Sequence, residues 1–190
     1  MFKRKKLQKK GFTLPELLTS ISIITLMTGL FLVNYRSTDR QTDLLLITQV
    51  MMSDLRVAQN YSLGLFEYEG EVPAGGWGVH FSTEIDVDEK YKYKIFADLN
   101  DNKEYDDSEA IIDLGGKVIE FPENIEIMSL EVDGEPVNTL NLVFSPPDPR
   151  TYINGEYLDN STAAITLHEK IGGSTTKVNI NFAGLIELDD

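Results

Sequence analysis

The chain has 190 residues, with 17 basic and 31 acidic side chains and no cysteine. That length leaves room for one membrane anchor and one domain of ordinary size. The lack of cysteine excludes disulfides, thiol catalysis and cysteine-ligated metals. The net charge of −14 opposes binding to phosphate backbones, so we expect no nucleic-acid partner.

A basic segment opens the chain, and a long apolar run follows it. Residues 1–11 carry six Lys or Arg and no acid, whereas residues 12–33 carry a single ionisable side chain, Glu16. As a helix, the apolar run would extend about 33 Å, enough to cross a hydrocarbon core of about 30 Å. The basic segment should stay in the cytoplasm, so the rest of the chain lies outside. We therefore expect a single-pass anchor in the inner membrane.

Glu16 needs an explanation, because a carboxylate inside an apolar span costs about 2–3 kcal/mol. One interpretation is that Glu16 has an oppositely charged partner. The other is that it lies at the interface and reaches water. A secretory signal would carry a small-residue cleavage site after the apolar run, but here the small residue, Gly11, comes before it.

The residues from Gly11 to Leu18, GFTLPELL, resemble the class III signal of type IV prepilins and type II secretion pseudopilins. The resemblance implies that a prepilin peptidase cleaves between Gly11 and Phe12 and methylates the new amino terminus of Phe12. It also implies that the Glu16 carboxylate meets the Phe12 amino group of a neighbouring subunit during assembly. Such a pair would offset the cost of burying each charge.

A second apolar series follows residue 33 and indicates an amphipathic helix, because its spacing alternates between three and four residues. Its members are Leu44, Ile47, Met51, Leu55 and Ala58. We predict one helix from about Leu14 to Ser62. The expected segments are a leader (1–11), a transmembrane and filament-core helix (12–33), the amphipathic second half of the helix (34–62) and a globular β-rich domain (63–190).

Beyond a Gly- and Pro-containing linker at residues 67–76, the pattern favours short strands separated by turn residues. The expected fold is α+β, a long N-terminal helix packed against a C-terminal antiparallel sheet, which is the pilin fold. Met128, Leu130 and Val132 should face inward, as should Val178, Ile180 and Phe182. Ile125 and Ile127 have the opposite phase, so the strand has a bulge near Ile127 or begins later. The predicted strands are 77–82, 91–97, 110–114, 117–121, 125–133, 138–144, 163–169, 176–182 and 184–188, with an exposed loop at 146–155.

Residues 98–109 match the side-chain ligand positions of a calcium loop. Alternate short oxygen-bearing side chains in a tight turn point toward one centre, and a final Glu completes the coordination sphere of the ion there. The predicted ligands are Asp98, Asn100, Asn102, the Glu104 carbonyl, Asp106 and Glu109. Lys103 departs from the template, which has glycine at that position for a turn with positive φ. The alternative is a solvated acidic turn that bonds its own backbone. Bound Ca²⁺ would have a structural role.

Several diffuse matches resemble the GspH/FimT minor pseudopilins, among them residues 54–60, 76–81, 96–100, 142–147 and 178–186. The resemblance implies a minor pilin or pseudopilin, a structural subunit of a type IV pilus or secretion pseudopilus whose partners are the prepilin peptidase, other such subunits and the inner membrane. The alternative is a filament-tip module for adhesion or DNA uptake, but the sequence has no basic cluster to favour DNA. Trp77 is expected in the core, His80 and His168 in packing or surface roles, and no enzymatic activity is expected.

Overall fold

A computed structural model describes residues 11–68, 70–83, 89–106, 118–146 and 150–189, without the side chains of residues 33–40. The chain divides into two compact units between Asp39 and Arg40. The helical residues are Leu14–Leu63 (α1), and they fall on both sides of that division. The structure is α+β, as expected, because the strands that follow α1 form two antiparallel sheets.

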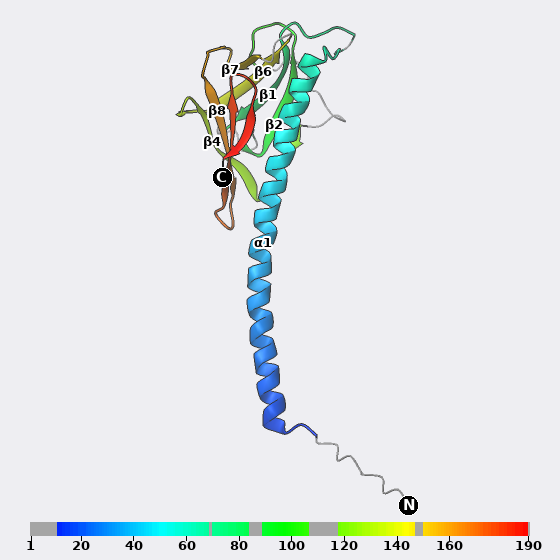
Figure 1. The fold of residues 1–190 in the computed structure, drawn as a ribbon, viewed down its shortest axis with the longest axis vertical. Coiled ribbons are helices and arrows are strands. Elements are labelled where there is room, and N and C mark those ends of the chain that lie inside the picture. The colour runs from blue at the N-terminus through cyan, green and yellow to red at the C-terminus, as the bar shows by residue number, and fades with distance from the viewer. Residues whose placement is uncertain (1–10, 69, 84–88, 107–117, 147–149, 190) are drawn as a thin grey trace, which may run out of the picture. The chain divides into compact units, whose positions relative to one another are not determined.

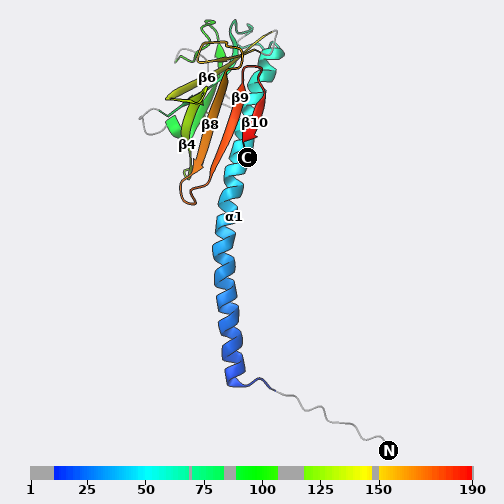
Figure 2. The same ribbon diagram turned by 60° about the vertical axis from the view of Figure 1, so that its left-hand side comes forward.

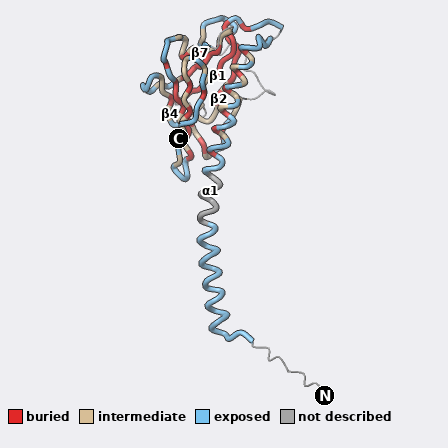
Figure 3. Tube along the Cα trace, in the orientation of Figure 1, coloured by how far each residue is buried: buried red, intermediate tan, exposed pale blue. Residues whose placement is uncertain are grey.

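The described part of the first unit is apolar helix with exposed side chains (Figure 3). Thr13 precedes α1 and accepts hydrogen bonds at its carbonyl from the backbone N–H groups of Glu16 and Leu17, both at 3.1 Å. Residues Leu14–Leu32 are long and apolar enough to span a membrane, by length and composition alone.

The second unit contains all the strands (Figures 1 and 2). One sheet has the order β3-β2-β1-β6-β7, and the other has the order β10-β9-β8-β4-β5. Every pairing is antiparallel. The bounds are β1 Gly76–Ser82, a 3-10 helix η1 Glu89–Tyr91, β2 Lys92–Asp98, β3 Ile119–Glu120, β4 Ile125–Val132, β5 Glu135–Val137, β6 Thr139–Ser145, β7 Arg150–Ile153, β8 Thr162–Glu169, β9 Thr175–Asn181 and β10 Ile186–Asp189.

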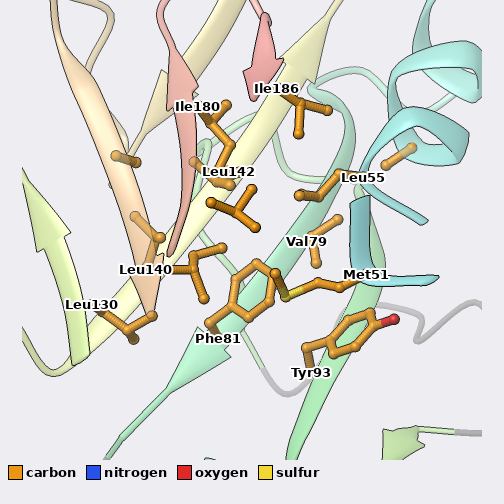
Figure 4. Close-up of a cluster of buried hydrophobic side chains, with 14 of the residues drawn as sticks. Met51, Leu55, Val79, Phe81, Tyr93, Leu130, Leu140, Leu142, Ile180 and Ile186 are labelled. Carbon is orange, nitrogen blue, oxygen red and sulfur yellow. The ribbon is translucent and has the colours of Figure 1, made fainter. Parts of the chain in front are cut away.

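The core of the second unit is built by both sheets and by one face of α1. Met51 and Leu55 project from α1 among side chains of both sheets (Figure 4), and neither is exposed to solvent. Leu44 and Ala58 are buried on the same face, which confirms that the second apolar series is the packed face of an amphipathic helix. Leu45, Leu46 and Val50 lie outside that face and are exposed.

Most of the predicted strands are present. Six of them agree with β1, β2, β4, β6, β8 and β9 to within one residue at each end, and β10 begins two residues later than predicted. The prediction of 117–121 reduces to β3, while 110–114 lies outside the described residues. The exposed loop predicted at 146–155 is wrong in part. Arg150–Ile153 is the edge strand β7, which pairs with β6 and buries Thr151 and Ile153.

A β-bulge in β4 explains the conflicting phases of that strand. The pairing with β8 shifts register between Ile127 and Ser129, as the sequence suggested. The extra residue of the bulge changes the phase of the strand. Ile125 and Ile127, which precede the bulge, and Leu130, which follows it, are therefore all buried. The prediction that Met128 faces inward is wrong, since it is 61% exposed. Val178 and Ile180 are buried as predicted, whereas Val132 and Phe182 are only partly buried.

Helix α1 ends in a Schellman motif. The N–H of Leu65 donates to the Ser62 carbonyl at 3.2 Å, and the N–H of Phe66 donates to the Tyr61 carbonyl at 2.9 Å. The rings of Tyr61 and Phe66 stack with centroids 4.6 Å apart, which is the apolar contact that accompanies this motif. Leu65 has a φ of +51°, at the position that usually holds glycine.

Candidate functional site

The residues of the prepilin-like signal lie at the start of α1. Gly11 and Phe12 are exposed, so the predicted cleavage bond is accessible in the isolated chain. The Glu16 carboxylate accepts long hydrogen bonds from the Thr13 N–H at 3.5 Å and the Thr13 hydroxyl at 3.3 Å. The bond from the Thr13 N–H is one half of a capping box; in the other half the Thr13 hydroxyl would accept the Glu16 N–H, but that N–H donates to the Thr13 carbonyl instead. Glu16 therefore has partners within its own chain.

A serine at the other end of α1 attaches the helix to both central strands. The Ser62 hydroxyl donates to the Phe144 carbonyl in β6 and accepts a hydrogen bond from the Trp77 N–H in β1 at 2.8 Å. Trp77 is 2% exposed, which confirms its expected place in the core, and its indole N–H donates to the Phe66 carbonyl at 3.2 Å. Hydrogen bonds between side chains and backbone groups thus hold together the last turn of α1, the turn after it and the sheet.

A second polar contact joins the middle of the packed helix to the sheet. The Tyr93 hydroxyl in β2 donates to the Asp54 carboxylate in α1. Burial raises the pKa of Asp54, and the Tyr93 hydrogen bond offsets only part of that effect. The pKa of Tyr93 is also raised, by burial and by the neighbouring Asp54. This pair could not be predicted from the sequence, because no local pattern links residues 39 positions apart.

The described part of the predicted calcium loop is a tight turn after β2. The fully buried Asp98 carboxylate accepts the N–H of Asn102 at 3.2 Å and that of Lys103 at 3.0 Å. The side-chain oxygen of Asn100 also accepts the Asn102 N–H, at 3.0 Å, and that of Asn102 accepts the Glu104 N–H at 2.8 Å. Three predicted ligand side chains therefore line one turn, and each already bonds to the backbone of that turn.

Of the remaining predicted ligands, Glu104 and Asp106 belong to the described residues. Asp106 accepts a hydrogen bond from the Asn100 side-chain amide at 2.7 Å, so these two are brought together. The Glu104 side chain is exposed and lies near Gly155, while Glu109 lies outside the described residues. Among the residues that are described, no group of three His, Cys, Asp or Glu side chains is arranged to hold a metal ion.

Lys103 has more contacts in this turn than its sequence pattern indicated. Its φ of +65° shows the strain expected for a lysine in place of glycine. Its ammonium group lies 3.6 Å from the Asp98 carboxylate, contacts Asp101 and donates to the Gly75 carbonyl at 2.8 Å. It also lies 5.2 Å from the centre of the Tyr152 ring. The only local signal was an unexpected basic residue within an acidic turn.

Four lysines gather near η1, where the sequence had suggested no basic cluster. Lys90 pairs with Glu126 at 2.9 Å, Lys92 with Glu89 at 2.8 Å, and Lys94 with Glu89 at 3.5 Å. Lys170 lies 4.7 Å from the centre of the Tyr91 ring. A hollow of about 610 Å³ beside them is also lined by Glu120 and Glu123. The carboxylates interleave with the lysines, so this region is not a basic groove of the kind that binds DNA.

The histidines have no metal-site geometry among the described residues. His80 Nδ1 lies 2.7 Å from the Asn141 side-chain oxygen, and His168 Nδ1 lies 3.6 Å from Glu126. No family model, curated protein or solved structure matches this chain.

Proposed function

We propose that this chain is a minor pilin or pseudopilin, a structural subunit of a type IV pilus or a type II secretion pseudopilus. The observation that carries the proposal is the Gly11 to Glu16 motif placed directly before an apolar helix. The amphipathic continuation of that helix in the core of an antiparallel β domain agrees with the same role. In this proposal α1 is one long pilin helix, with its first half in the membrane and later in the filament core.

Maturation would begin at the inner membrane. A prepilin peptidase removes residues 1–11 and methylates Phe12, and six of the 17 basic side chains leave with the leader. In the unassembled subunit, the Glu16 carboxylate accepts only long hydrogen bonds from the Thr13 N–H and hydroxyl. On assembly, that carboxylate exchanges Thr13 for the charged amino group of a neighbouring subunit's first residue, which is a stronger partner in an apolar bundle.

Calcium binding at residues 98–109 is a separate proposal. The oxygen-bearing side chains of Asp98, Asn100 and Asn102 supply hard ligands, and bound Ca²⁺ would stiffen an exported domain that has no disulfide. The chemistry of these side chains fits the ion, but their backbone hydrogen bonds and the Lys103 ammonium would compete with it. Its effect would be on stability.

Intact mass after co-expression with a prepilin peptidase tests the proposed function. We expect the wild-type chain to lose residues 1–11 and to gain one methyl group on Phe12. Gly11→Ala should abolish both changes, while Gly29→Ala, within the apolar run, should be processed normally. A wild-type chain that keeps its leader would reject the pilin proposal and leave a membrane-anchored β domain.

A further inference from the structure

The turn after α1 leaves a group of apolar side chains about half exposed, although one of them, Phe66, also stacks on Tyr61. Leu63, Leu65, Phe66 and Val72 are each between 44% and 54% exposed, and we call them the helix-end patch. Exposed apolar side chains that cluster in this way mark interaction sites more often than scattered ones do. The patch lies in the segment that leads from α1 to β1, beside the contact between Ser62 and Trp77.

Leu65 indicates that the patch is more than a by-product of folding. A leucine at a φ of +51° costs about 1–2 kcal/mol relative to glycine, because its Cβ crowds the backbone. Burial of the Leu65 side chain within the second unit offsets little of that cost, because the side chain remains 53% exposed. Strained backbone of this kind is concentrated at functional positions. A role outside the isolated domain would account for the leucine.

The electrostatics of the patch specify the chemistry of its partner. The exposed Glu67 and Glu71 flank the apolar side chains, and the sequence has no Lys or Arg between Arg56 and Lys90. The Lys103 ammonium reaches the Gly75 carbonyl of this segment, but it is already paired with two carboxylates, those of Asp98 and Asp101. A complementary surface would therefore present an apolar side chain next to a cationic one.

The opposite end of the second unit has that combination. Strand β1 starts at Gly76, next to the end of α1, and finishes about 20 Å away at Ser82. Near that far end, the β8–β9 turn is held by a hydrogen bond from the Lys170 N–H to the Asn124 carbonyl at 2.9 Å. Figures 1 and 2 show this turn and the end of α1 at opposite ends of the unit. Ile171 at the turn is 64% exposed.

Lys170 supplies the charge next to Ile171. Its side chain is exposed, and its ammonium group contacts the Tyr91 hydroxyl at 3.4 Å. No carboxylate of the described residues lies within ion-pair distance of it. Lys170 is therefore available to a carboxylate on another molecule.

We infer that the helix-end patch of one copy docks on the β8–β9 turn of a second copy, with Ile171 against Leu65 and Phe66 and with Lys170 near Glu67 or Glu71. The two surfaces lie at different ends of one domain, so the contact is heterologous. This inference rests on the proposed function, since it names the neighbour that the domain meets in a filament.

Disulfide trapping tests the contact cleanly, because the natural chain has no cysteine. Full-length Leu65→Cys and Ile171→Cys chains, of distinguishable mass, would be mixed in detergent and oxidised. We expect mixed dimers to exceed random pairing by about threefold or more, and the excess to fall with added salt as the charges are screened. The control mixes Leu65→Cys with Met128→Cys, which is similarly exposed (61%) on β4. Random pairing in both mixtures would overturn the inference.

A second arm separates a docking role for Leu65 from a purely structural one. In this arm, a Val72→Cys chain is mixed with an Ile171→Cys chain, and the yield of mixed dimers is measured. The measurement is then repeated with a Val72→Cys chain that also carries Leu65→Gly. The docking role predicts at least a twofold loss of mixed dimers although the domain becomes more stable. An unchanged yield would remove Leu65 from the contact. Leader removal is measured separately by mass. A chain that loses its leader but does not cross-link rejects this inference alone. A chain that cross-links but keeps its leader rejects the proposed function.

Discussion

Ser62, in the last turn of α1, donates its hydroxyl proton to the backbone carbonyl of Phe144 in β6. The same oxygen accepts the N–H of Trp77 in β1, so one buried hydroxyl joins the helix to two neighbouring strands. A Cβ on Gly76 would come within 2.1 Å of the Phe144 carbonyl oxygen, so the close approach of these strands requires glycine there.

Ser62→Ala should destabilise the second unit by about 1–3 kcal/mol, because it leaves a buried N–H and a buried carbonyl without this partner. Chemical denaturation of the full chain in detergent measures the effect. Ser53→Ala is the matched control, since Ser53 is an exposed serine on the same helix, and it should change stability by less than about 0.5 kcal/mol. Equal effects of the two substitutions would contradict the role given to Ser62.

Leu65→Gly should stabilise the chain by about 1 kcal/mol, because glycine adopts positive φ without crowding. Leu65→Ala removes almost the same side chain but keeps the Cβ, so it should give little or none of that gain. Comparing the two in thermal melts isolates the backbone contribution. A similar gain from both would place the cost in the exposed side chain instead.

The Asp54 carboxyl should make stability depend on pH. Its folded-state pKa is raised above the ordinary value of 3.8, so the folded chain binds the proton more tightly than the unfolded chain does. The contribution of this group is complete below pH 3.8 and is lost as pH rises through the folded-state pKa. Asp54→Asn keeps an oxygen for the Tyr93 hydroxyl and does not titrate. Its stability relative to wild type should therefore improve from pH 3.5 to pH 7, in denaturation measured at both values.

Tyr93→Phe tests the other half of this pair. The substitution keeps the buried ring and removes the hydroxyl that donates to Asp54, so it should cost about 1–2 kcal/mol at pH 7. It should also raise the pKa of Asp54 further, because the hydrogen bond that lowers it is lost. Combined with Asp54→Asn, it should cost less than the sum of the two single changes if the pair is coupled.

Asp98→Ala should destabilise the chain by about 3 kcal/mol even in chelator, since it leaves Lys103 and two backbone N–H groups without the buried carboxylate. Asp101→Asn is the control, because Asp101 also contacts Lys103 but its side chain is 58% exposed, and asparagine tolerates the φ of +61° at this position as aspartate does. That change should cost less than about 1 kcal/mol.

The calcium proposal is tested by melting the wild-type chain in Ca²⁺ and in chelator. Bound Ca²⁺ should raise the melting temperature, and Asp98→Ala should remove that response. Lys103→Gly should increase the response, because it removes the competing ammonium group and the strained φ together. Identical wild-type melting temperatures in the two conditions would reject calcium binding.

Features encoded by neighbouring residues could be predicted from the sequence. The apolar run, the packed face of α1 and six of the strand positions follow from composition and period, because a side chain's direction repeats every 3.6 residues in a helix and every two in a strand. The phase conflict between Ile127 and Leu130 indicated either a bulge near Ile127 or a later start of the strand, and the structure has the bulge. Met128 was misplaced because the period of two was continued through that bulge.

Only the tertiary structure decided which distant groups meet. Strand β7 was hidden because its pairing with β6 is a contact between segments, and the prolines before it favoured a loop. The contacts of Ser62 with Phe144, of Tyr93 with Asp54 and of Lys103 with Gly75 join residues 28 to 82 positions apart. Chain folding brings such groups within hydrogen-bond distance, and burial then requires them to pair, but no local pattern in the sequence records the match.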